Sequence, residues 1–415
     1  MPAHACYSAL CATLRWTLGK KQTVDVEVTM RSKLSEMRIS KLLLIPLMAM
    51  VQGAAATDEA LATSRAASLV EQYVRSEVPG LQYAVVTAER TLFAYAGGWA
   101  DIQNRQAMAA DSTLMAYSMT KTFTAVAVLQ LVERGALSLD DPMDRYLPDS
   151  PYHGRGITVR QLLDHTSGVP NPIPLRWVHL AAEDADFDEA QALAAVLREH
   201  PGLAFEPGQK FAYSNIGYWL LGKVVEKVAG QSYSAYVRAN LLRPLGLSAQ
   251  EMDFVIPDPR RHAKGYLEKY SWMNLAKGFV MDRKYLGDYE GNWLRLQDHY
   301  LNGPAFGGLV GTAQGFGRFL QDQLRTESVL FTQATKHLLQ AAQTDGAGRP
   351  LKMALGWHLG EADGEAYWFK EGGGGGFHSE MRIYQNKGIA TVVLVNSTGF
   401  NSSKFLNRVD RVFFQ

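Results

Sequence analysis

The sequence is poor in cysteine, in net charge and in long apolar runs. It holds two cysteines in 415 residues, Cys6 and Cys11, both near the N-terminus. A domain that begins after them uses neither disulfide bonds nor thiol chemistry. The formal net charge is +1, from 42 basic and 41 acidic residues. This balance argues against nucleic acid or an anionic membrane as a partner.

Signals for metals and cofactors are also missing. The ten histidines show no zinc-type pairing such as His-Glu-x-x-His. The one low-complexity stretch, Gly372–Gly376, precedes a predicted strand and not a helix, so it does not match a phosphate-binding loop. We therefore expect no metal and no cofactor.

The N-terminal part resembles a secretory signal over residues 37–56. Arg38 and Lys41 precede a ten-residue apolar stretch, Leu42–Val51, and Ala54-Ala55-Ala56 offers a cleavage site. The stretch is too short for a stable membrane span, although an uncleaved anchor or a core helix remains an alternative. We predict that residues 1–36 are a non-native or mis-started extension, and that residues 57–415 form a single catalytic domain. Its net charge would be −3, from 35 basic and 38 acidic residues. We expect a periplasmic or secreted protein.

The remaining chain, 47% hydrophobic in the whole sequence, reads as strands, then helices, then strands. Periodicity predicts helices at 57–78, 122–134, 158–165, 189–200, 216–229, 233–242, 312–324, 332–341 and 400–414. It predicts strands at 81–87, 91–96, 353–359, 366–370, 378–384 and 389–396. This order predicts an α+β fold: an antiparallel sheet from about 57–115 and 350–415, flanked by helices, with an inserted helical region over about 135–345.

A Ser-x-x-Lys motif, Ser118 to Lys121, stands before the amphipathic run Thr122–Arg134. Residues three apart in a helix share a face, so the Lys121 amine can reach the Ser118 hydroxyl. A serine becomes a nucleophile when a neighbouring base takes its proton, and a buried lysine with a lowered pKa can be that base. The motif alone is also found by chance in ordinary surface helices.

Two further motifs make chance a poor explanation. Tyr213-Ser214-Asn215 follows a Pro-Gly turn, and Lys370-Glu371-Gly372 ends a predicted strand. With Ser-x-x-Lys, these elements give the chain a plain resemblance to the serine β-lactamase and penicillin-binding-protein superfamily. It is most similar to the class C β-lactamase and esterase branch, over about residues 65–398. The stretches 137–142, 162–168 and 307–309 fit the same resemblance.

The resemblance implies a role for each matching residue. Ser118 would attack an acyl carbon and Lys121 would accept its proton. Tyr213 would relay a proton to the leaving group, as a phenolate or as a hydrogen-bonded phenol. Asn215, Lys370, Glu371 and Gly372 would contact the substrate, and the backbone N–H groups of Ser118 and Gly373 would form an oxyanion hole. Tyr213, Asn215 and Lys370 could instead be a buried tyrosine, a helix cap and a solvated strand end.

One residue departs from the family pattern. A threonine or another small residue usually stands at the position of Glu371, where its hydroxyl helps to bind the carboxylate of β-lactams and peptide C-termini. A glutamate there would repel an anion. This puts β-lactam and D-alanyl recognition in doubt and leaves the acyl chemistry intact.

Two other features have competing interpretations. His165 could be a catalytic base, but its position at a helix end favours a structural role. The aromatic residues between Tyr266 and Tyr300, including Trp272 and Phe279, could line a substrate cleft or pack the core.

We therefore expect a serine hydrolase that forms an acyl-enzyme on a small ester, peptide or β-lactam substrate, with esterase activity favoured. A β-lactamase and a D-alanyl-D-alanine carboxypeptidase are alternatives within the same chemistry. A catalytically silent binding protein for cell-wall peptides is an alternative of another class. The oligomeric state does not follow from the sequence.

Overall fold

The computed structural model describes residues 17–18, 22–23, 44–172, 177–271, 273–275, 277 and 281–414, with side chains from residue 58 onward. It contains two compact units, Met1–Asp58 and Glu59–Gln415. In the first unit, β1 (Thr17–Leu18) pairs antiparallel with β2 (Gln22–Thr23), and helix α1 (Leu44–Ser76) begins. The predicted 1–36 extension, with both cysteines, lies mostly outside the described residues.

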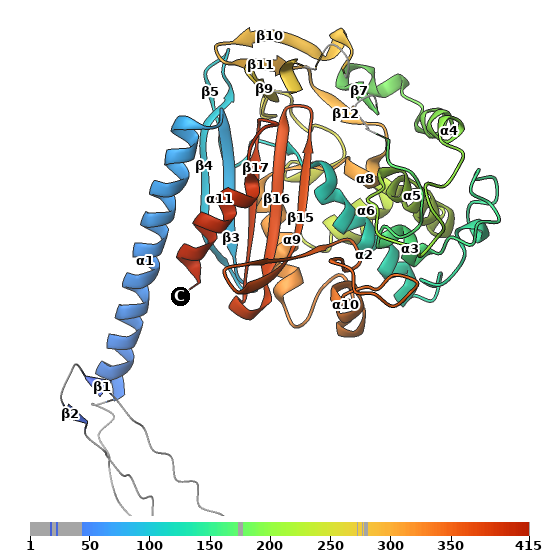
Figure 1. The fold of residues 1–415 in the computed structure, drawn as a ribbon. Helices are drawn as coiled ribbons and strands as arrows, with labels where there is room; N and C mark the ends of the chain where they lie inside the picture. The colour runs from blue at the N-terminus through green and yellow to red at the C-terminus, as the bar shows by residue number, and fades with distance from the viewer. Residues whose placement is uncertain are drawn as a thin grey trace, which may run out of the picture. The chain divides into compact units, whose positions relative to one another are not determined.

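A seven-stranded sheet organises the second unit, in the order β14-β15-β16-β17-β3-β4-β5 (Figure 1). Every neighbouring pair is antiparallel. The first four strands come from the C-terminal end of the chain and the last three from the N-terminal end. Their bounds are β3 Gly80–Val86, β4 Thr91–Asp101, β5 Gln106–Ala107, β14 His358–Ala362, β15 Glu365–Gly374, β16 Phe377–Tyr384 and β17 Ile389–Val395.

Helices cover both faces of this sheet. Figure 1 shows α11 in front of the sheet and α9 behind it. The central strands β3 and β17 are buried along their whole length, because strands covered on both faces meet no solvent. The remaining helices are α2 Thr120–Glu133, α3 Val159–Leu163, α4 Glu189–Glu199, α5 Asn215–Ala229, α6 Tyr233–Val237, α8 Pro304–Gly307, α9 Ala313–Leu324, α10 Gln333–Gln340 and α11 Ser402–Val409.

Helix α2 is the centre of the core. Twelve of its 14 residues are buried, and it packs against α5, α8 and α10. The helix predicted for this segment, and its burial, are confirmed, but its residues are buried on all sides and not along a single face, so the amphipathic pattern does not hold. A 3₁₀ turn, Tyr117–Met119, leads into the helix, so Ser118 lies at its start as predicted.

Short sheets interrupt the helical region. They are β9 (Tyr266–Glu268) with β10 (Leu286–Glu290) and β11 (Trp293–Leu296), β7 (Val178–Leu180) with β12 (His299–Leu301), and β6 (Leu114–Met115) with β8 (Met252–Asp253) and β13 (Val310–Gly311). None of the predicted helices or strands falls in residues 252–304. Strands of two to five residues carry too little alternation to be recognised in a sequence.

Two predicted boundaries also differ. Helix α1 begins at Leu44 and not at Thr57. The strand predicted at 353–359 begins only at His358, because Gly356, with φ of +83°, turns the chain just before it.

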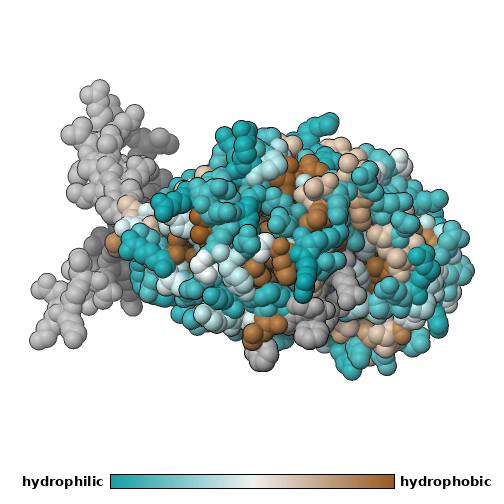
Figure 2. Space-filling view, turned by 90° about the horizontal axis from the view of Figure 1, so that it is seen from above, coloured by the Kyte–Doolittle hydropathy of each residue, from teal (hydrophilic) through white to brown (hydrophobic). Residues whose placement is uncertain are grey.

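No helix in the described part of the chain is both long and apolar enough to cross a membrane. Figure 2 views the molecule from above, where hydrophobic residues lie in small groups among hydrophilic ones. The exposed apolar side chains of the unit include Tyr270, Leu275 and Tyr289, which belong to the β9–β10 region. Trp272 and Phe279 of the predicted aromatic stretch lie outside the described residues.

Candidate active site

The turn before Ser118 is held from several sides. Tyr117 has an unusual φ of +47°, a conformation that a non-glycine residue keeps only where its surroundings impose it. Its hydroxyl lies 3.0 Å from the Gly375 carbonyl oxygen and 2.9 Å from His299 Nε2. The Ser379 hydroxyl donates to the Ala116 carbonyl oxygen at 2.9 Å. These contacts fix the turn, and Ser118 itself stays partly exposed.

Lys121 lies one turn after Ser118 and is fully buried. Its Nζ is 3.0 Å from Ser118 Oγ, 2.7 Å from Asn215 Oδ1 and 2.6 Å from the Phe306 carbonyl oxygen. The last two groups can only accept hydrogen bonds, whereas the serine hydroxyl can also donate. A neutral amine satisfies all three partners, with two N–H donors and a lone pair that faces Ser118. Burial and the nearby Lys370 charge lower the pKa of Lys121 well below its ordinary value.

Tyr213 reaches Ser118 from the other side of the hydroxyl. Its OH donates to Ser118 Oγ at 2.8 Å. Burial of this hydroxyl raises the pKa of Tyr213, which favours its neutral form. The Tyr213 ring packs against the His165 ring at a tilt of 39°, with 4.4 Å between ring centroids.

Two amines flank the Tyr213 ring. Lys121 Nζ lies 5.0 Å from the ring centroid and Lys370 Nζ lies 5.1 Å from it. Lys370 is fully buried, and burial lowers its pKa to about 7. Its Nζ is 3.5 Å from His358 Nε2, a partner that carries no negative charge to stabilise an ammonium group. The sequence prediction that Lys370 stands beside Tyr213 matches this placement, and the alternative of a solvated strand end does not.

Asn215 is positioned by the start of α5. The Ser214 hydroxyl caps the helix by accepting from the Gly217 N–H at 2.9 Å, a typical role for serine at this position. Asn215, the first residue of the helix, then holds Lys121 through its side-chain oxygen. Its backbone N–H donates to Asn171 Oδ1 at 3.0 Å.

Strand β15 brings the third motif next to Ser118. A Cβ added at Gly372 would lie 2.9 Å from the Ser118 nitrogen and would also collide with the Ala116 carbonyl oxygen. Gly372 is therefore required for this close approach. Gly373 lies in the wall of the cavity that contains Ser118. Lys370 and Gly372 thus face the site from alternate positions of the strand.

Glu371 lies on the other face of β15, since side chains alternate along a strand. Its Oε1 is 2.9 Å from His378 Nε2, and its side chain is about half exposed. The hydrogen bond from His378 lowers the pKa of Glu371. The structure does not place this carboxylate in the wall of the cavity. Its charge still acts on the site: burial is the main cause of the raised pKa of Tyr213 and the lowered pKa of Lys370, and the Glu371 charge adds to the first shift and offsets part of the second.

Several contributors were not recognised in the sequence. The Phe306 carbonyl oxygen binds Lys121, His358 lies beside Lys370, and His299 holds Tyr117. A backbone carbonyl carries no sequence signal, and a lone histidine gives only a weak one. His165 was predicted to be structural. It is fully buried, accepts the Ser214 N–H at 3.1 Å, and supports the Tyr213 ring.

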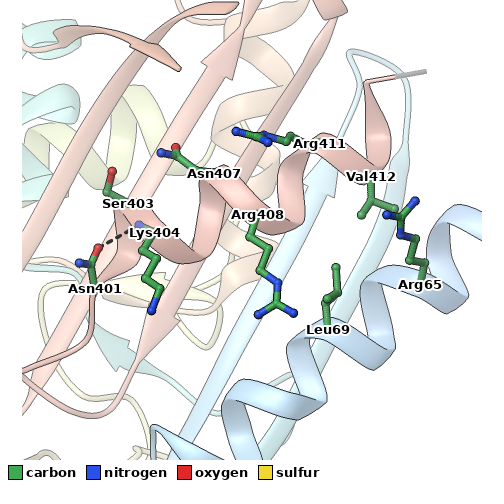
Figure 3. A pocket seen from close by; sticks show the side chains of 9 residues that line it. All are labelled: Arg65, Leu69, Asn401, Ser403, Lys404, Asn407, Arg408, Arg411 and Val412. Carbon is green, nitrogen blue, oxygen red and sulfur yellow. Dashed lines mark hydrogen bonds between the residues drawn. The ribbon is translucent and has the colours of Figure 1, made fainter. Parts of the chain in front are cut away.

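A cavity of about 270 Å³ opens beside Ser118, between α8, β12 and the glycine run at the end of β15. A larger hollow, of about 830 Å³, lies between α1 and α11, where Arg65, Lys404, Arg408 and Arg411 surround it (Figure 3). Neither Ser118 nor Tyr213 lines that basic hollow, so the Ser118 motif belongs to the smaller cavity. Among the described residues, no cluster of three or more His, Cys, Asp or Glu side chains could hold a metal ion.

Two known proteins are similar to part of this chain. Penicillin-binding protein 4* of Bacillus subtilis is 33% identical over 159 residues, which cover 38% of this chain and 34% of that protein. Protein flp of Staphylococcus aureus is 30% identical over 198 residues, covering 46% and 38%. The match thus spans little more than a third of these relatives.

Solved structures share the fold. The octameric penicillin-binding protein homologue from Pyrococcus abyssi superposes with a TM-score of 0.67 at 24% identity, over 83% of this chain and 75% of that one. D-amino acid amidase from Ochrobactrum anthropi reaches 0.71 at 22% identity, over 85% and 98%. The family model described as Beta-lactamase matches residues 66–412. The chain therefore belongs to the Beta-lactamase family, within the serine β-lactamase and penicillin-binding-protein superfamily.

Proposed function

We propose that this protein is a serine hydrolase that forms an acyl-enzyme at Ser118, with esters favoured over amides as substrates. The observation that carries the proposal is the position of the Ser118 hydroxyl. It lies between Lys121 Nζ at 3.0 Å and the Tyr213 hydroxyl at 2.8 Å. A nucleophile that contacts both a base and a proton donor is the arrangement that acyl transfer requires.

The proton moves in a closed sequence. Ser118 Oγ attacks the acyl carbon while its proton passes to neutral Lys121. When the bond to the leaving group breaks, Tyr213 gives its proton to the departing oxygen or nitrogen, and Lys121 returns a proton to Tyr213. Water then attacks the acyl-enzyme while Lys121 takes its proton, and Lys121 passes that proton to Ser118 Oγ as the acyl–oxygen bond breaks and the carboxylic acid leaves. Asn215 and the Phe306 carbonyl hold the amine in place through their hydrogen bonds.

The backbone N–H groups of Ser118 and Gly373 are the proposed oxyanion hole. Both residues line the same cavity, and fixed N–H donors stabilise the charge that develops on the carbonyl oxygen. The absence of a side chain at Gly372 supports this role, because it lets β15 approach the Ser118 turn.

The preference for esters rests on the third motif. Glu371 stands in place of the small hydroxyl residue that would bind a substrate carboxylate, and its charge adds only a weak, screened repulsion from the outer face of β15, so we expect a modest preference. A β-lactamase and a D-alanyl-D-alanine carboxypeptidase must both bind such a carboxylate. A silent peptide-binding protein would need no base beside Ser118. Lys121, with its lowered pKa, is such a base, and this favours an enzyme.

Covalent labelling tests the proposal. We expect a fluorophosphonate to add one label to the intact protein, on Ser118, and short-chain aryl esters to be hydrolysed faster than a chromogenic cephalosporin. Ser118→Ala should remove the label and lower turnover by about 10³-fold or more. Ser64→Ala, an exposed position on α1, is the matched control and should keep both. Turnover by Ser118→Ala within tenfold of the wild type would contradict the proposal.

We also propose that the protein acts outside the cytoplasm, after removal of residues 37–56. The charged start, the apolar stretch and the small residues before Thr57 support this proposal. N-terminal sequencing of the exported protein should find a start near Thr57. A protein retained in the cytoplasm, or one that keeps the stretch, would contradict it.

A further inference from the structure

The glycine run at the end of β15 makes room for the cavity beside Ser118. A Cβ at Gly374 would collide with the Tyr117 ring, and a Cβ at Gly375 would stand 3.3 Å from Leu296 and 3.5 Å from His299. Leu296 and His299 both line the cavity. A side chain at Gly375 would therefore occupy the space that a substrate can use. The glycine run, Gly372–Gly376, which the sequence alone did not explain, thus leaves space for the cavity beside Ser118.

The wall of this cavity carries no Asp, Glu, Lys or Arg among its described lining residues. Its apolar members include Val178, Met273, Met281, Leu296, Leu301 and Phe306. The cavity is therefore suited to an uncharged group, because burying a charge without a partner is strongly unfavourable.

The polar side chains in the wall already have partners within the protein. Tyr117 and His299 bind each other at 2.9 Å, and the Tyr285 hydroxyl donates to the Val178 carbonyl oxygen at 2.7 Å. The Thr398 hydroxyl donates to the Gly374 carbonyl oxygen at 2.8 Å. What these residues offer to a ligand is mainly apolar surface.

The cavity lies on the acyl side of Ser118. Tyr213, the proton donor for the leaving group, does not line it, and neither does Lys370. The leaving group must lie next to Tyr213 to receive its proton. The group on the other side of the carbonyl carbon is then the one that enters the cavity.

We infer that the substrates are esters or amides of neutral, apolar carboxylic acids, whose acyl chain fills this cavity. The inference rests on the proposed function and adds the substrate class. A cavity of about 150 Å³ lined by apolar side chains can hold benzene. The volume here is about 270 Å³, which suits a phenylalkyl group or a chain of about six carbons.

A series of p-nitrophenyl esters from acetate to dodecanoate tests the inference. We expect kcat/KM to rise about fourfold for each methylene up to hexanoate, as for burial of a CH₂ group, and then to level off. The mono-p-nitrophenyl ester of adipic acid has the same length with a terminal carboxylate, and it should react about 100-fold more slowly than hexanoate at pH 7. Equal kcat/KM for acetate and hexanoate, or for hexanoate and the adipate ester, would overturn the inference.

Variants at the cavity wall make the test specific. Gly375→Leu should lower the hexanoate-to-acetate ratio of kcat/KM at least tenfold, because its side chain points at Leu296. Gly202→Leu is the control, since Gly202 is exposed and no atom lies within 4 Å of its added Cβ, and it should keep the wild-type ratio. Leu301→Ala enlarges the cavity and should move the optimum to longer chains. An unchanged optimum in Leu301→Ala would overturn the inference even if Gly375→Leu does not fold.

Failure of the inference and failure of the proposed function give different results. Acetate hydrolysis that needs Ser118 but shows no dependence on chain length leaves the serine hydrolase in place and removes the substrate class. No hydrolysis of any ester or amide, with no fluorophosphonate label, removes both.

Discussion

Two buried polar clusters lie on opposite faces of the large sheet, and they differ in charge balance. On the face of α11, Arg382 donates to Glu380 at 2.6 Å, and Asp410 accepts from the Tyr83 and Tyr384 hydroxyls at 2.7 and 2.8 Å. On the face of α2, the charged groups are Lys121 and Lys370. Both clusters are almost fully buried.

Among the residues that the structure describes, no carboxylate contacts the amines of the α2 cluster. The partners of Lys121 are a serine, an amide and a carbonyl, and the nearest described partner of Lys370 is His358. Two buried cations that repel each other are stabilised by losing a proton. The same degree of burial thus gives a fixed ion pair on one face and a proton acceptor on the other.

The largest expected effect comes from removing proton transfer in the α2 cluster. Lys121→Met and Tyr213→Phe should each lower kcat/KM by about 10³-fold, and the double variant should lose little more, because groups that act as one unit are not additive. Steady-state kinetics on an aryl ester, with folding checked by circular dichroism, gives the measurement. A double variant that multiplies the two single losses would contradict the shared relay.

Stability compares the two clusters directly. Arg382→Met should lower the free energy of unfolding by about 3–5 kcal/mol, because it leaves Glu380 buried without its partner. Lys121→Met removes a buried amine that contacts no described carboxylate, and it should lower that free energy by only about 1–3 kcal/mol, because it leaves the Asn215 and Phe306 oxygens without their donor. Urea unfolding of both variants measures the difference. Equal destabilisation by the two substitutions would show that the charge balance does not distinguish the clusters.

The pH dependence tests the coupling between the two lysines. Burial and the Lys370 charge lower the pKa of Lys121, and the proposed mechanism needs Lys121 neutral. Lys370→Met removes that charge and raises the pKa of Lys121, so the rising acid limb of the kcat/KM profile should move to higher pH, by about one unit. Lys404→Met, an exposed lysine of α11, should leave the limb in place. A limb that moves to lower pH, or does not move, would contradict the coupling.

The smallest expected effect concerns Glu371, which lies near the end of β15 on the face that points away from Ser118. Its carboxylate binds His378 and does not line the cavity, so its repulsion of a substrate anion acts only at a distance. Glu371→Thr should narrow the preference for aryl acetate over a chromogenic cephalosporin by less than about threefold, since solvent screens the exposed carboxylate. A reversal of the preference would mean that Glu371 contacts the substrate.

Much of the site followed from local sequence. The spacing of Ser118 and Lys121 puts both side chains on one helical face, and the Ser-Asn pair after a turn predicts the start of α5. Periodicity also identified the main helices and most strands of the large sheet. The short strands β7 to β12 were missed, because they are stabilised by the neighbours that they pair with and not by their own residues.

Alternation along a strand fixes that Lys370 and Glu371 point to opposite faces, so the sequence determined this much about the third motif. The sequence could not decide whether the side chain of Lys370 or that of Glu371 points toward Ser118. That choice depends on how β15 packs against the Ser118 turn, where Gly372 alone permits contact. The low pKa of Lys121 was decided in the same way. It requires that Lys121 is buried from water and that Lys370, which comes from a distant part of the chain, lies close enough for its charge to act.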